Sequence, residues 1–572
     1  MKVSNLIRIC EENNTTKSLI ILFFTLTVVF TVSYKTIFNV NYTELQGSHC
    51  WLSASTIKFV NNWLEEGPLT LSFVNYESPA SIEFNNNTER GPYISYPSGC
   101  TLFVYIAAKI SGNSAIDISF LKHLQMICFW IETLLLGLFV YGFLGRNNVK
   151  SEFEKIIASF ATASLWLLLP INVWYLANIY FADQCVTLFV MAFLIIEYEY
   201  LFSEKQSSKR LLNGIRALIL FCGLLIDYYF WIMAFVAFVI EMIYLVRNQN
   251  REKIWGCILW YGLPAILAIA FYMYQLISIP NWLTVLESKF LVRTGIELTS
   301  TGDGRFNTFN TLKLRIWENF ANAFGLSSLR IGGLCMLIII CLLSLDHKFN
   351  PLMKIKNYFK NTIAIRNIVI LIIGFVSPIL QVILLRNHSA IHEFSMIKFS
   401  WCIAIMPILF SLILCLLFDF SNNTHNSKKR MFSPFFHCFV VTFLLILVFT
   451  NVPSSSIAFR STRSIVDNDY SLANIIRNHT SYEHVCFSFT DEIAENPPQD
   501  LSISKKRVYK INNLNDIQSM FPSLSSKAVK ILVINKKMAK TRSSNQKEQE
   551  IQLQSSNKTI FNDTNYTLVQ IN

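Results

Sequence analysis

Charged residues are scarce in this chain. Asp, Glu, Lys and Arg make up 15% of its 572 residues, whereas soluble proteins carry about 25%. The sequence also lacks a glycine-rich P-loop, a His-Glu-x-x-His zinc motif and a Gly-x-Ser-x-Gly turn. It therefore carries no signature of a P-loop nucleotide-hydrolysing enzyme, of a zinc metalloprotease or of a serine α/β-hydrolase. Apolar residues make up 52% of the chain, and 47 residues are Phe. This composition is typical of a membrane protein.

The sequence also has no Cys-x-x-Cys pair, and most of its 13 cysteines fall in apolar segments. Cys50 and Cys100 lie in or beside the first long polar loop. A disulfide between them would fit an oxidising compartment, and two free, small apolar side chains are the alternative. No small-residue cleavage pattern follows Phe38, so we expect the first apolar run to remain in the protein as a membrane span.

Apolar runs alternate with short polar loops, and most runs approach the roughly 20 residues that a helix needs to cross a bilayer. The sequence therefore predicts an α-helical multi-pass membrane protein with about eleven transmembrane helices. These spans are expected near residues 18–38, 121–144, 155–170, 184–202, 214–226, 230–246, 254–276, 331–345, 367–385, 397–418 and 433–452.

The formal net charge is +12, and clusters of basic residues fall in alternate loops, such as those with Arg146, Lys209 and Arg251. An excess of Lys and Arg marks cytoplasmic loops. This pattern predicts a cytoplasmic N-terminus and, with an odd number of spans, an extracytoplasmic C-terminus. It also accounts for the charge without nucleic acid as a partner, because no basic domain stands apart. The membrane is expected to be a prokaryotic plasma (inner) membrane, or the endoplasmic reticulum in a eukaryote.

Two units are expected. Residues 1–452 form the transmembrane domain, with a large first outer loop at 39–120 and a second outer loop at 277–330. In the first loop, an amphipathic helix from Leu52 to Gly67 would lie on the membrane surface, and a second short helix would follow at 102–110. Residues 453–572 form a small extracytoplasmic α/β domain, predicted from alternating strand and helix patterns. After Lys536 the Ser, Asn, Gln and Lys content favours disorder.

Two candidate catalytic residues follow the first span. Glu44 lies at its outer mouth, where a carboxylate could act as general base on an acceptor hydroxyl or amine. His49 could orient or share the proton. A solvated loop acid and an ordinary surface histidine are the alternatives.

A rigid turn at 89–99 combines groups that suit a phosphorylated, sugar-bearing lipid. Glu89, Arg90, Tyr93 and Tyr96 precede or flank Pro97. A guanidinium can hold phosphate in bidentate fashion, and the tyrosine rings could stack on a sugar or a prenyl chain. The alternative is a structural turn that anchors the loop on the membrane.

Acids and bases also occur at the ends of later spans. Asp183 and Asp227 each fall at an outer helix end, either facing a cavity or a partner or simply favoured by a helix N-terminus. In the short turn before the 397–418 span, His388, His392 and Glu393 have a spacing that a metal could use, but one short turn rarely supplies a full metal site. Phosphate or sugar binding by Arg386, His392 and Lys398, with His388 beside them, is the better interpretation. Arg293, in the second outer loop, is a further candidate for the phosphate. Within the spans, His123 and Glu132 are expected to be paired or to line a groove.

This architecture resembles the GT-C superfamily of membrane glycosyltransferases, in particular the protein O-mannosyltransferases and the bacterial lipid A aminoarabinose transferases. The likeness covers most of the chain. The segment Tyr93-Ile94-Ser95-Tyr96-Pro97-Ser98-Gly99 resembles that family's Tyr-x-x-x-Pro-Pro segment, and Asp183 resembles its acid after the third span. Glu44 is the nearest match to the catalytic acid of the first loop. The family commonly has an Asp-Glu pair there, whereas Glu44 stands alone with His49 following.

The resemblance implies transfer of a sugar from a polyprenyl-phosphate carrier to a glycan, lipid or protein acceptor on the extracytoplasmic face. No nucleotide, metal or other cofactor is expected. Two other hypotheses remain: a transporter or lipid/oligosaccharide flippase, and a non-catalytic membrane protein of polysaccharide assembly. The absence of an internal repeat and of paired broken helices disfavours the first of these.

Overall fold

The computed structural model describes most of the chain in two parts. The described residues are 3–38, 49–77, 90–147, 151–247, 251–295, 309–325 and 362–419 in the membrane part, and 469–481, 484–489, 508–520, 528–536 and 543–571 in the C-terminal part, with a few single positions between these ranges.

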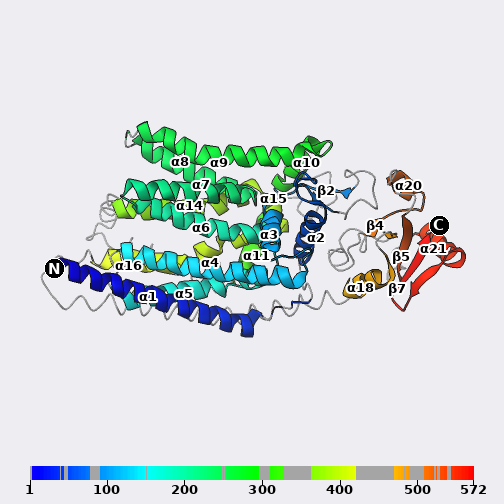
Figure 1. Cartoon of the computed structure of the whole chain (residues 1–572), viewed down its shortest axis with the longest axis horizontal. Coiled ribbons are helices and arrows are strands. Elements are labelled where there is room, and N and C mark those ends of the chain that lie inside the picture. The colour runs from blue at the N-terminus through cyan, green and yellow to red at the C-terminus, as the bar shows by residue number, and fades with distance from the viewer. Residues whose placement is uncertain are drawn as a thin grey trace.

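Long, nearly parallel helices build the membrane part (Figure 1). They are α1 (Val3–Ser33), α4 (Ile118–Arg146), α5 (Glu152–Leu167), α6 (Ala182–Phe202), α7 (Gln206–Leu224), α8 (Tyr228–Arg247), α9 (Arg251–Ile277), α14 (Thr362–Leu384) and α16 (Ser400–Asp419). Local signals begin some of them: the carboxylate of Asp117 accepts the Phe120 N–H at the start of α4, and the hydroxyl of Ser151 caps α5.

The helices share one continuous apolar core, in which Phe129 of α4 and Trp166 of α5 are almost fully buried. α4 packs against both α5 and α6, and α7 packs against α9. Many apolar side chains on the outside of α1 and α9 stay exposed, among them Phe24 at 61% and Ile266 at 63%. An exposed apolar belt of this kind suits contact with lipid.

Six described helices are long and apolar enough to cross a membrane: 15–38, 118–146, 182–202, 228–247, 252–277 and 365–384. They confirm that this is a helical, integral membrane protein. The predicted spans at 155–170, 214–226 and 397–418 also coincide with helices, of which α5 has only 16 residues. The predicted spans at 331–345 and 433–452 lie outside the described residues.

Short elements gather at one end of the bundle, here called the site end (Figure 1). They are the π-helical turn η1 (Tyr34–Phe38), α2 (Trp51–Glu66), the ribbon of β1 (Asn75–Tyr76) and β2 (Pro92–Tyr93), α3 (Gly99–Ile110), the π-helical turn η3 (Asn172–Leu176), α10 (Trp282–Thr294), α11 (Phe309–Phe324), α15 (Arg386–Ile391) and the 3-10 helix η5 (Glu393–Phe399).

The helix predicted from Leu52 to Gly67 exists as α2, and Gly67 ends it with a positive φ of 89°. Its expected position on the membrane surface is wrong, because most of its residues are buried in protein. Trp63 packs with Leu276 and Ile279 at the end of α9 on one side. On the other side, the hydroxyl of Thr56 lies 3.4 Å from the Tyr180 carbonyl. The amphipathic pattern of α2 therefore arises from its contacts with other parts of the protein rather than with lipid headgroups.

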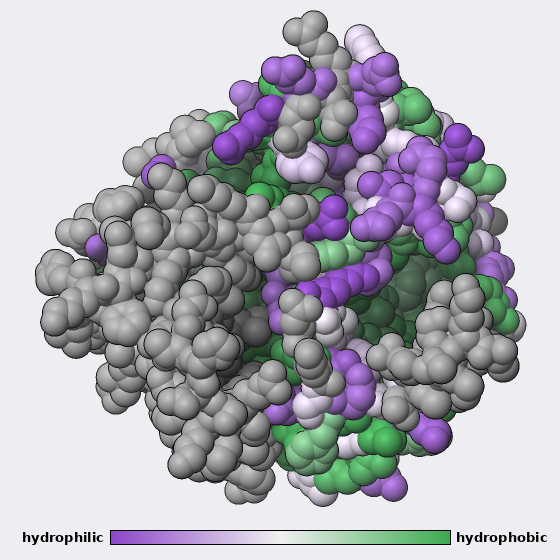
Figure 2. Space-filling model, turned by 90° about the vertical axis from the view of Figure 1, so that its left-hand side faces the viewer, coloured by the Kyte–Doolittle hydropathy of each residue, from purple (hydrophilic) through white to green (hydrophobic). Residues whose placement is uncertain are grey.

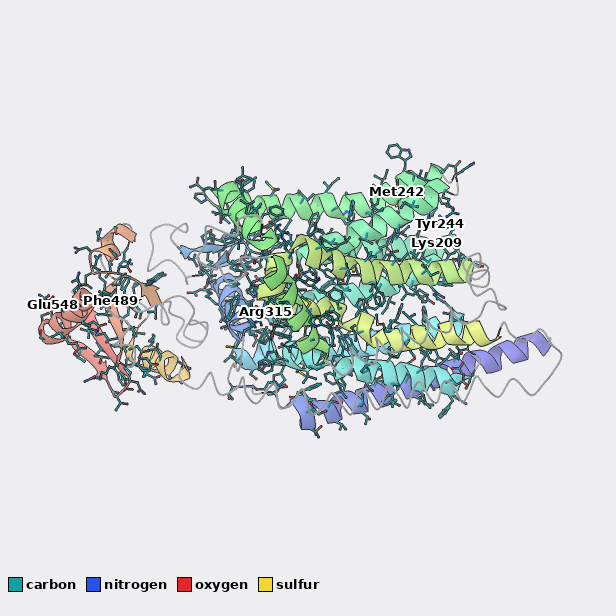
Figure 3. All side chains as sticks on the ribbon, turned by 180° about the vertical axis from the view of Figure 1, so that it is seen from behind. Lys209, Met242, Tyr244, Arg315, Phe489 and Glu548 are labelled. Carbon is teal, nitrogen blue, oxygen red and sulfur yellow. The ribbon has the colours of Figure 1, made fainter. Side chains whose placement is uncertain are left out.

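The opposite end of the bundle carries the basic loops. Hydrophilic side chains form a patch on that end, bordered by apolar surface (Figure 2). Lys209, Met242 and Tyr244 lie there, whereas Arg315 of α11 lies toward the site end (Figure 3). Where the structure describes them, the loops that the charge pattern selected therefore share one end, and the described candidate residues of the outer loops lie toward the other.

The C-terminal part contains a five-stranded sheet in the order β4-β3-β5-β7-β6. Its elements are α18 (Asp469–His479), β3 (His484–Ser488), β4 (Val508–Lys510), α20 (Asp516–Met520), β5 (Val529–Asn535), α21 (Ser544–Ser556), β6 (Thr559–Asn562) and β7 (Tyr566–Ile571). β3 pairs in parallel with β4 and β5, and β5 pairs antiparallel with β7. This confirms a small C-terminal α/β sheet.

The expectation of disorder after Lys536 is wrong. β7 is an inner strand of the sheet, and Leu568 and Val569 are fully buried. Ser543 and Gln546 begin α21 with a reciprocal capping box. The prediction of disorder was based on the polar composition of this segment. The run Tyr566-Thr567-Leu568-Val569 nevertheless contains the β-branched and aromatic residues that a strand favours.

Candidate functional site

Buried ionisable residues from distant parts of the sequence meet at the site end. Asp183 lies in the first turn of α6, and Asp227 directly precedes α8. Lys398 lies in η5, just before α16. Tyr96 belongs to the turn between β2 and α3, and Arg293 lies in the last turn of α10.

Lys398 bridges the two aspartates. Its Nζ lies 2.6 Å from Asp183 Oδ1 and 2.8 Å from Asp227 Oδ2. All three side chains are at most 2% exposed. Two carboxylates around one ammonium leave a formal charge of −1 in a buried environment, which is costly unless a further cation or a proton balances it. The guanidinium of Arg293, which lies over the ring of Tyr96, is a further cation close to this triad.

Helix ends help to hold the two acids. Asp183 stands at the positive N-terminal end of α6, and Asp227 Oδ1 accepts the Tyr229 N–H at 2.9 Å at the start of α8. Both alternatives from the sequence therefore apply, since each acid is favoured by a helix start and also faces charged partners.

Tyr96 connects the triad to a histidine. Its hydroxyl lies 3.1 Å from Asp183 Oδ2 and 3.3 Å from His388 Nε2. Burial, and then the charge of Asp183, raise the pKa of Tyr96 well above its ordinary value, so the phenol keeps its proton. Tyr96 can therefore donate to the carboxylate and holds Asp183 in position.

Gly99 sets the position of the Tyr96 turn. Its N–H donates to the Leu225 carbonyl at 2.7 Å, which ties the start of α3 to the turn that carries Asp227. A Cβ at position 99 would lie 2.3 Å from that same carbonyl oxygen. Only glycine allows this approach, and the approach brings Tyr96 and Asp227 to the same cluster.

Arg293 lies over the aromatic floor of the site. Its Cζ is 4.4 Å from the centroid of the Tyr96 ring and 5.6 Å from that of Tyr228. Within the described ranges, no carboxylate lies at ion-pair distance from Arg293. A stacked guanidinium keeps its in-plane N–H groups available, which is the geometry for bidentate binding of a phosphate.

Neighbouring residues support α10 rather than bind a ligand. Arg386 donates to the carbonyls of Thr294 and Gly295, and Asn387 donates to the Val292 carbonyl at 2.7 Å. These bonds satisfy the last carbonyls of α10 and hold its C-terminal turn against α15.

Three histidines form the other wall. The ring centroids of His388 and His392 are 4.7 Å apart, and those of His49 and His392 are 6.0 Å apart. Burial lowers the pKa of His49, lowers that of His388 well below its ordinary value, and lowers that of His392 to about 4. All three imidazoles are therefore neutral at neutral pH. Beside them, Tyr175 donates to Glu393 at 2.7 Å.

The structure uses Arg90 differently from the sequence hypothesis. Its guanidinium forms a bidentate pair with Glu66, at 2.9 and 2.6 Å, and it is fully buried. A guanidinium paired in this way joins α2 to the β2 turn and has little left for phosphate. Tyr93 packs its ring 5.4 Å from Phe59 at the edge of the same turn. Glu44 and Glu89 lie outside the described residues.

The sequence identified six residues of this site, but only as separate candidates. They are Asp183, Tyr96, Arg293, His388, His392 and Lys398. The sequence placed Asp227 at an outer helix end but did not assign it to the site, and it missed Tyr228 as part of the floor. The signal for both was an acid followed by two phenols at a helix start. Their closeness to Lys398 depends on the fold.

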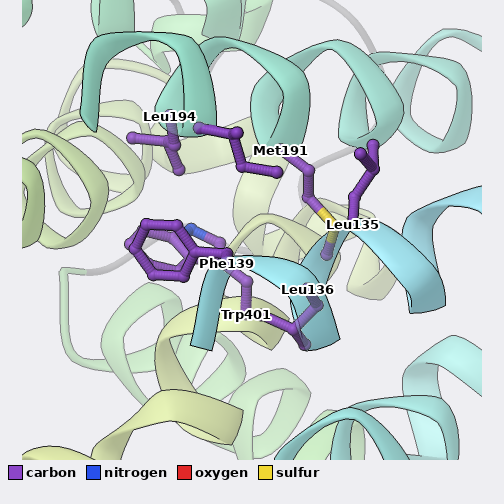
Figure 4. A pocket seen from close by; sticks show the side chains of 7 residues that line it. Leu135, Leu136, Phe139, Met191, Leu194 and Trp401 are labelled. Atoms are coloured by element: carbon purple, nitrogen blue, oxygen red, sulfur yellow. The ribbon is translucent and has the colours of Figure 1, made fainter. Parts of the chain in front are cut away.

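No group of three His, Cys, Asp or Glu side chains in the described part of the chain has the geometry of a metal site. Cys50 and Cys100 are both buried, and no disulfide joins them. Between α4, α6 and α16 lies an apolar pocket lined by Leu135, Phe139, Met191, Leu194 and Trp401, among others (Figure 4). Its volume of about 10 Å³ is too small for a prenyl chain in this conformation.

No protein-family model and no curated protein matches the sequence. The fold, however, is similar to that of solved membrane enzymes. The archaeal oligosaccharyltransferase AglB from Archaeoglobus fulgidus, solved with an inhibitory peptide and a dolichol-phosphate, aligns over 91% of this chain and 69% of its own, with a TM-score of 0.50 and 12% identity. ArnT from Cupriavidus metallidurans in the apo state aligns over 97% of this chain and 98% of its own, with a TM-score of 0.48 and 10% identity.

At this level of identity the likeness to AglB shows the fold. The chain is an integral membrane protein with a fold similar to that of AglB, which agrees with the fold that the resemblance in the sequence implied.

Proposed function

We propose that this protein is a membrane glycosyltransferase that moves a sugar from a polyprenyl-phosphate carrier to an acceptor. The observation that carries the proposal is Arg293, a cation without a carboxylate partner in the described part of the site, stacked on Tyr96 beside the Asp183–Lys398–Asp227 triad. A phosphate-binding cation next to a buried acid is the pair of groups that transfer from a lipid phosphate requires. AglB, which has the same fold, was solved with a dolichol-phosphate.

Each residue of the site has a distinct role in the proposed transfer. Arg293 binds the phosphate and stabilises the charge that develops on it as the sugar–phosphate bond breaks. Asp183 takes the proton from the acceptor as the acceptor oxygen or nitrogen bonds to the sugar. Polyprenyl phosphate leaves with the electron pair. Lys398 and Tyr96 are positioning residues, since both hold Asp183. His388 and His392, neutral and close to Tyr96, suit hydrogen bonds to sugar hydroxyls, and His49 extends that wall.

The positive-inside rule places the basic end of the bundle in the cytoplasm. The site end and the C-terminal sheet then belong to the extracytoplasmic side of a plasma membrane, or to the lumen of the endoplasmic reticulum in a eukaryote. A lipid-linked donor fits this placement, because its phosphate emerges at the headgroup level. The acceptor is a glycan, a lipid or a protein.

The experiment uses the full-length protein in lipid nanodiscs with a radiolabelled polyprenyl-phosphate sugar and a cell-envelope extract as acceptor. Wild type is expected to release polyprenyl phosphate and to label the acceptor. Arg293→Ala should raise the donor KM, and Asp183→Asn should abolish transfer while donor binding persists. Arg315→Ala is the matched control, because Arg315 is exposed on α11 and pairs with Glu318 at 3.1 Å.

Transfer that survives Arg293→Ala and Asp183→Asn together would refute this site. Movement of the labelled lipid across the bilayer of proteoliposomes, without any transferred product, would instead favour a flippase.

A further inference from the structure

A second polar site lies inside the bundle, separate from the triad. Glu132 is the fifteenth of the 29 residues of α4 and is therefore at the centre of that helix. Its side chain is 1% exposed. No basic side chain lies at ion-pair distance from Glu132 in the part of the chain that the structure describes. An ionised carboxylate at the middle of a span and without a counter-charge is one of the most costly groups that a membrane protein can contain.

The hydrogen bonds around Thr187 indicate how this cost is avoided. The Thr187 hydroxyl oxygen lies 2.7 Å from Glu132 Oε1 and 2.6 Å from the Gln184 carbonyl oxygen. A hydroxyl carries one hydrogen, and a backbone carbonyl can only accept. If that hydrogen goes to Gln184, the short contact with Glu132 needs a hydrogen from the carboxyl group. The arrangement is satisfied when Glu132 is a neutral acid that donates to Thr187.

A small cavity adjoins the same carboxyl group. It has a volume of about 10 Å³ and is lined by polar and apolar residues of α4, of η3, of α6 and of the segment between η3 and α6. The lining residues are Gln125, Cys128, Phe129, Glu132, Leu176, Tyr180, Gln184, Cys185 and Leu188. A volume of roughly 10–15 Å³ suffices for one water molecule when two to four polar groups can bind it.

The lining supplies those groups. Glu132 Oε2, Gln125 Oε1 and both polar atoms of the Gln184 amide are buried and have no hydrogen-bond partner among the residues that the structure describes. Buried polar atoms are rarely left unpaired, because each one costs about 1–3 kcal/mol. Four such atoms around one cavity indicate a ligand that can both donate and accept, and the volume limits that ligand to water.

We propose that Glu132 is a protonated carboxylic acid in the folded protein and that it binds an ordered water together with Gln125 and Gln184. The neutral acid and the water join α4 to α6 through hydrogen bonds without placing a charge in the span. Since Gln184 follows Asp183 directly, the site also supports the start of α6, where the triad is built. The proposal does not depend on the proposed function.

Infrared spectroscopy tests the protonation state in nanodiscs. The difference spectrum between wild type and Glu132→Gln is expected to contain the C=O stretch of a protonated carboxylic acid at neutral pH, shifted by D₂O. Glu132→Gln should also leave the thermal midpoint nearly unchanged, because one neutral hydrogen-bonding group replaces another. Glu197→Gln is the contrasting variant, since Glu197 pairs with the buried Arg216, and its midpoint should fall. A difference spectrum that contains only carboxylate bands would overturn the assignment.

Radiolytic footprinting tests the water. X-ray pulses generate hydroxyl radicals at ordered waters, so Cys185, which lines the cavity and is 6% exposed, should be oxidised several-fold faster than Cys402. Cys402 is 1% exposed and does not line this cavity. The difference should disappear in a Gln125→Leu/Gln184→Leu variant. Equal oxidation of the two cysteines in wild type would show that the cavity is dry.

Discussion

The ammonium of Lys398 lies 2.6 Å from the carboxylate of Asp183, although 215 residues separate them in the chain. The contact joins the start of α6 to η5, and Asp227 completes it from the start of α8. Three elements that carry no common sequence signal thus meet through one cation.

We expect Lys398→Met to destabilise the protein by about 3–5 kcal/mol, because it leaves two buried aspartates without their cation. Thermal unfolding in nanodiscs measures this loss. The triple variant Lys398→Met/Asp183→Asn/Asp227→Asn should recover part of the stability, since no buried charge then remains unpaired. If the triple variant is less stable than Lys398→Met alone, the three side chains do not act as an ion cluster.

Arg90 and Arg293 should behave in opposite ways. Arg90→Met is expected to lower the thermal midpoint and leave the donor KM unchanged, because Arg90 pairs with Glu66. Arg293→Met is expected to raise the donor KM by roughly 10- to 150-fold, from the loss of about 1.5–3 kcal/mol of charged hydrogen bonding, with a smaller effect on stability. A similar rise in donor KM for both variants would show that Arg90 also binds the phosphate.

Stability should fall on acidification. Burial lowers the pKa of His392 from 6.5 to about 4, so the unfolded chain takes up the proton first. The stability from the neutral imidazole is complete above pH 6.5 and is lost as the pH falls toward 4. This loss is at most about 3 kcal/mol for His392, and His388 and His49 shift in the same direction. Unfolding of His392→Gln should depend less steeply on pH than that of wild type, and identical slopes would contradict the prediction.

Gly99→Ala should reduce transfer activity, because the new Cβ would force the Leu225 carbonyl away and displace the adjoining Asp227. Gly142→Ala is the control. Gly142 lies within α4 with open space around its Cβ position, and alanine there should stabilise the helix by up to about 1 kcal/mol. Labelled-donor turnover and thermal midpoints of both variants check this pair. Wild-type activity for Gly99→Ala would show that the close approach does not position Asp227.

Removal of residues 558–572 should unfold the C-terminal sheet. The deletion takes away β6 and β7, and with them the antiparallel partner of β5. Limited proteolysis should then cleave the C-terminal part rapidly while the membrane helices stay protected. A protease-resistant truncated protein would mean that the tail is dispensable for the sheet.

The sequence itself determined the described helices and the end of the bundle toward which the described candidate residues of the outer loops lie. Apolar runs of bilayer length are a local property, and nine of them became helices at the expected positions. The alternation of basic and non-basic loops predicted which end of each helix carries the positive charge, and this prediction did not require information on how the helices pack. The strand patterns that predicted the C-terminal α/β domain likewise coincide with β3, β4 and β5, which are short apolar runs. The same reasoning misjudged α2 and β7, because burial on a second face and strand pairing depend on partners elsewhere in the chain.

Only the tertiary structure decided which of the candidate residues act together. Arg90 and Arg293 are equal in the sequence as guanidinium groups near the membrane, yet Glu66 neutralises the first and an aromatic floor leaves the second available. Asp227 and Lys398 likewise acquire their roles from a contact of 2.8 Å across 171 residues. Electrostatic interactions depend on distance and burial, and neither quantity is contained in the order of residues along the chain.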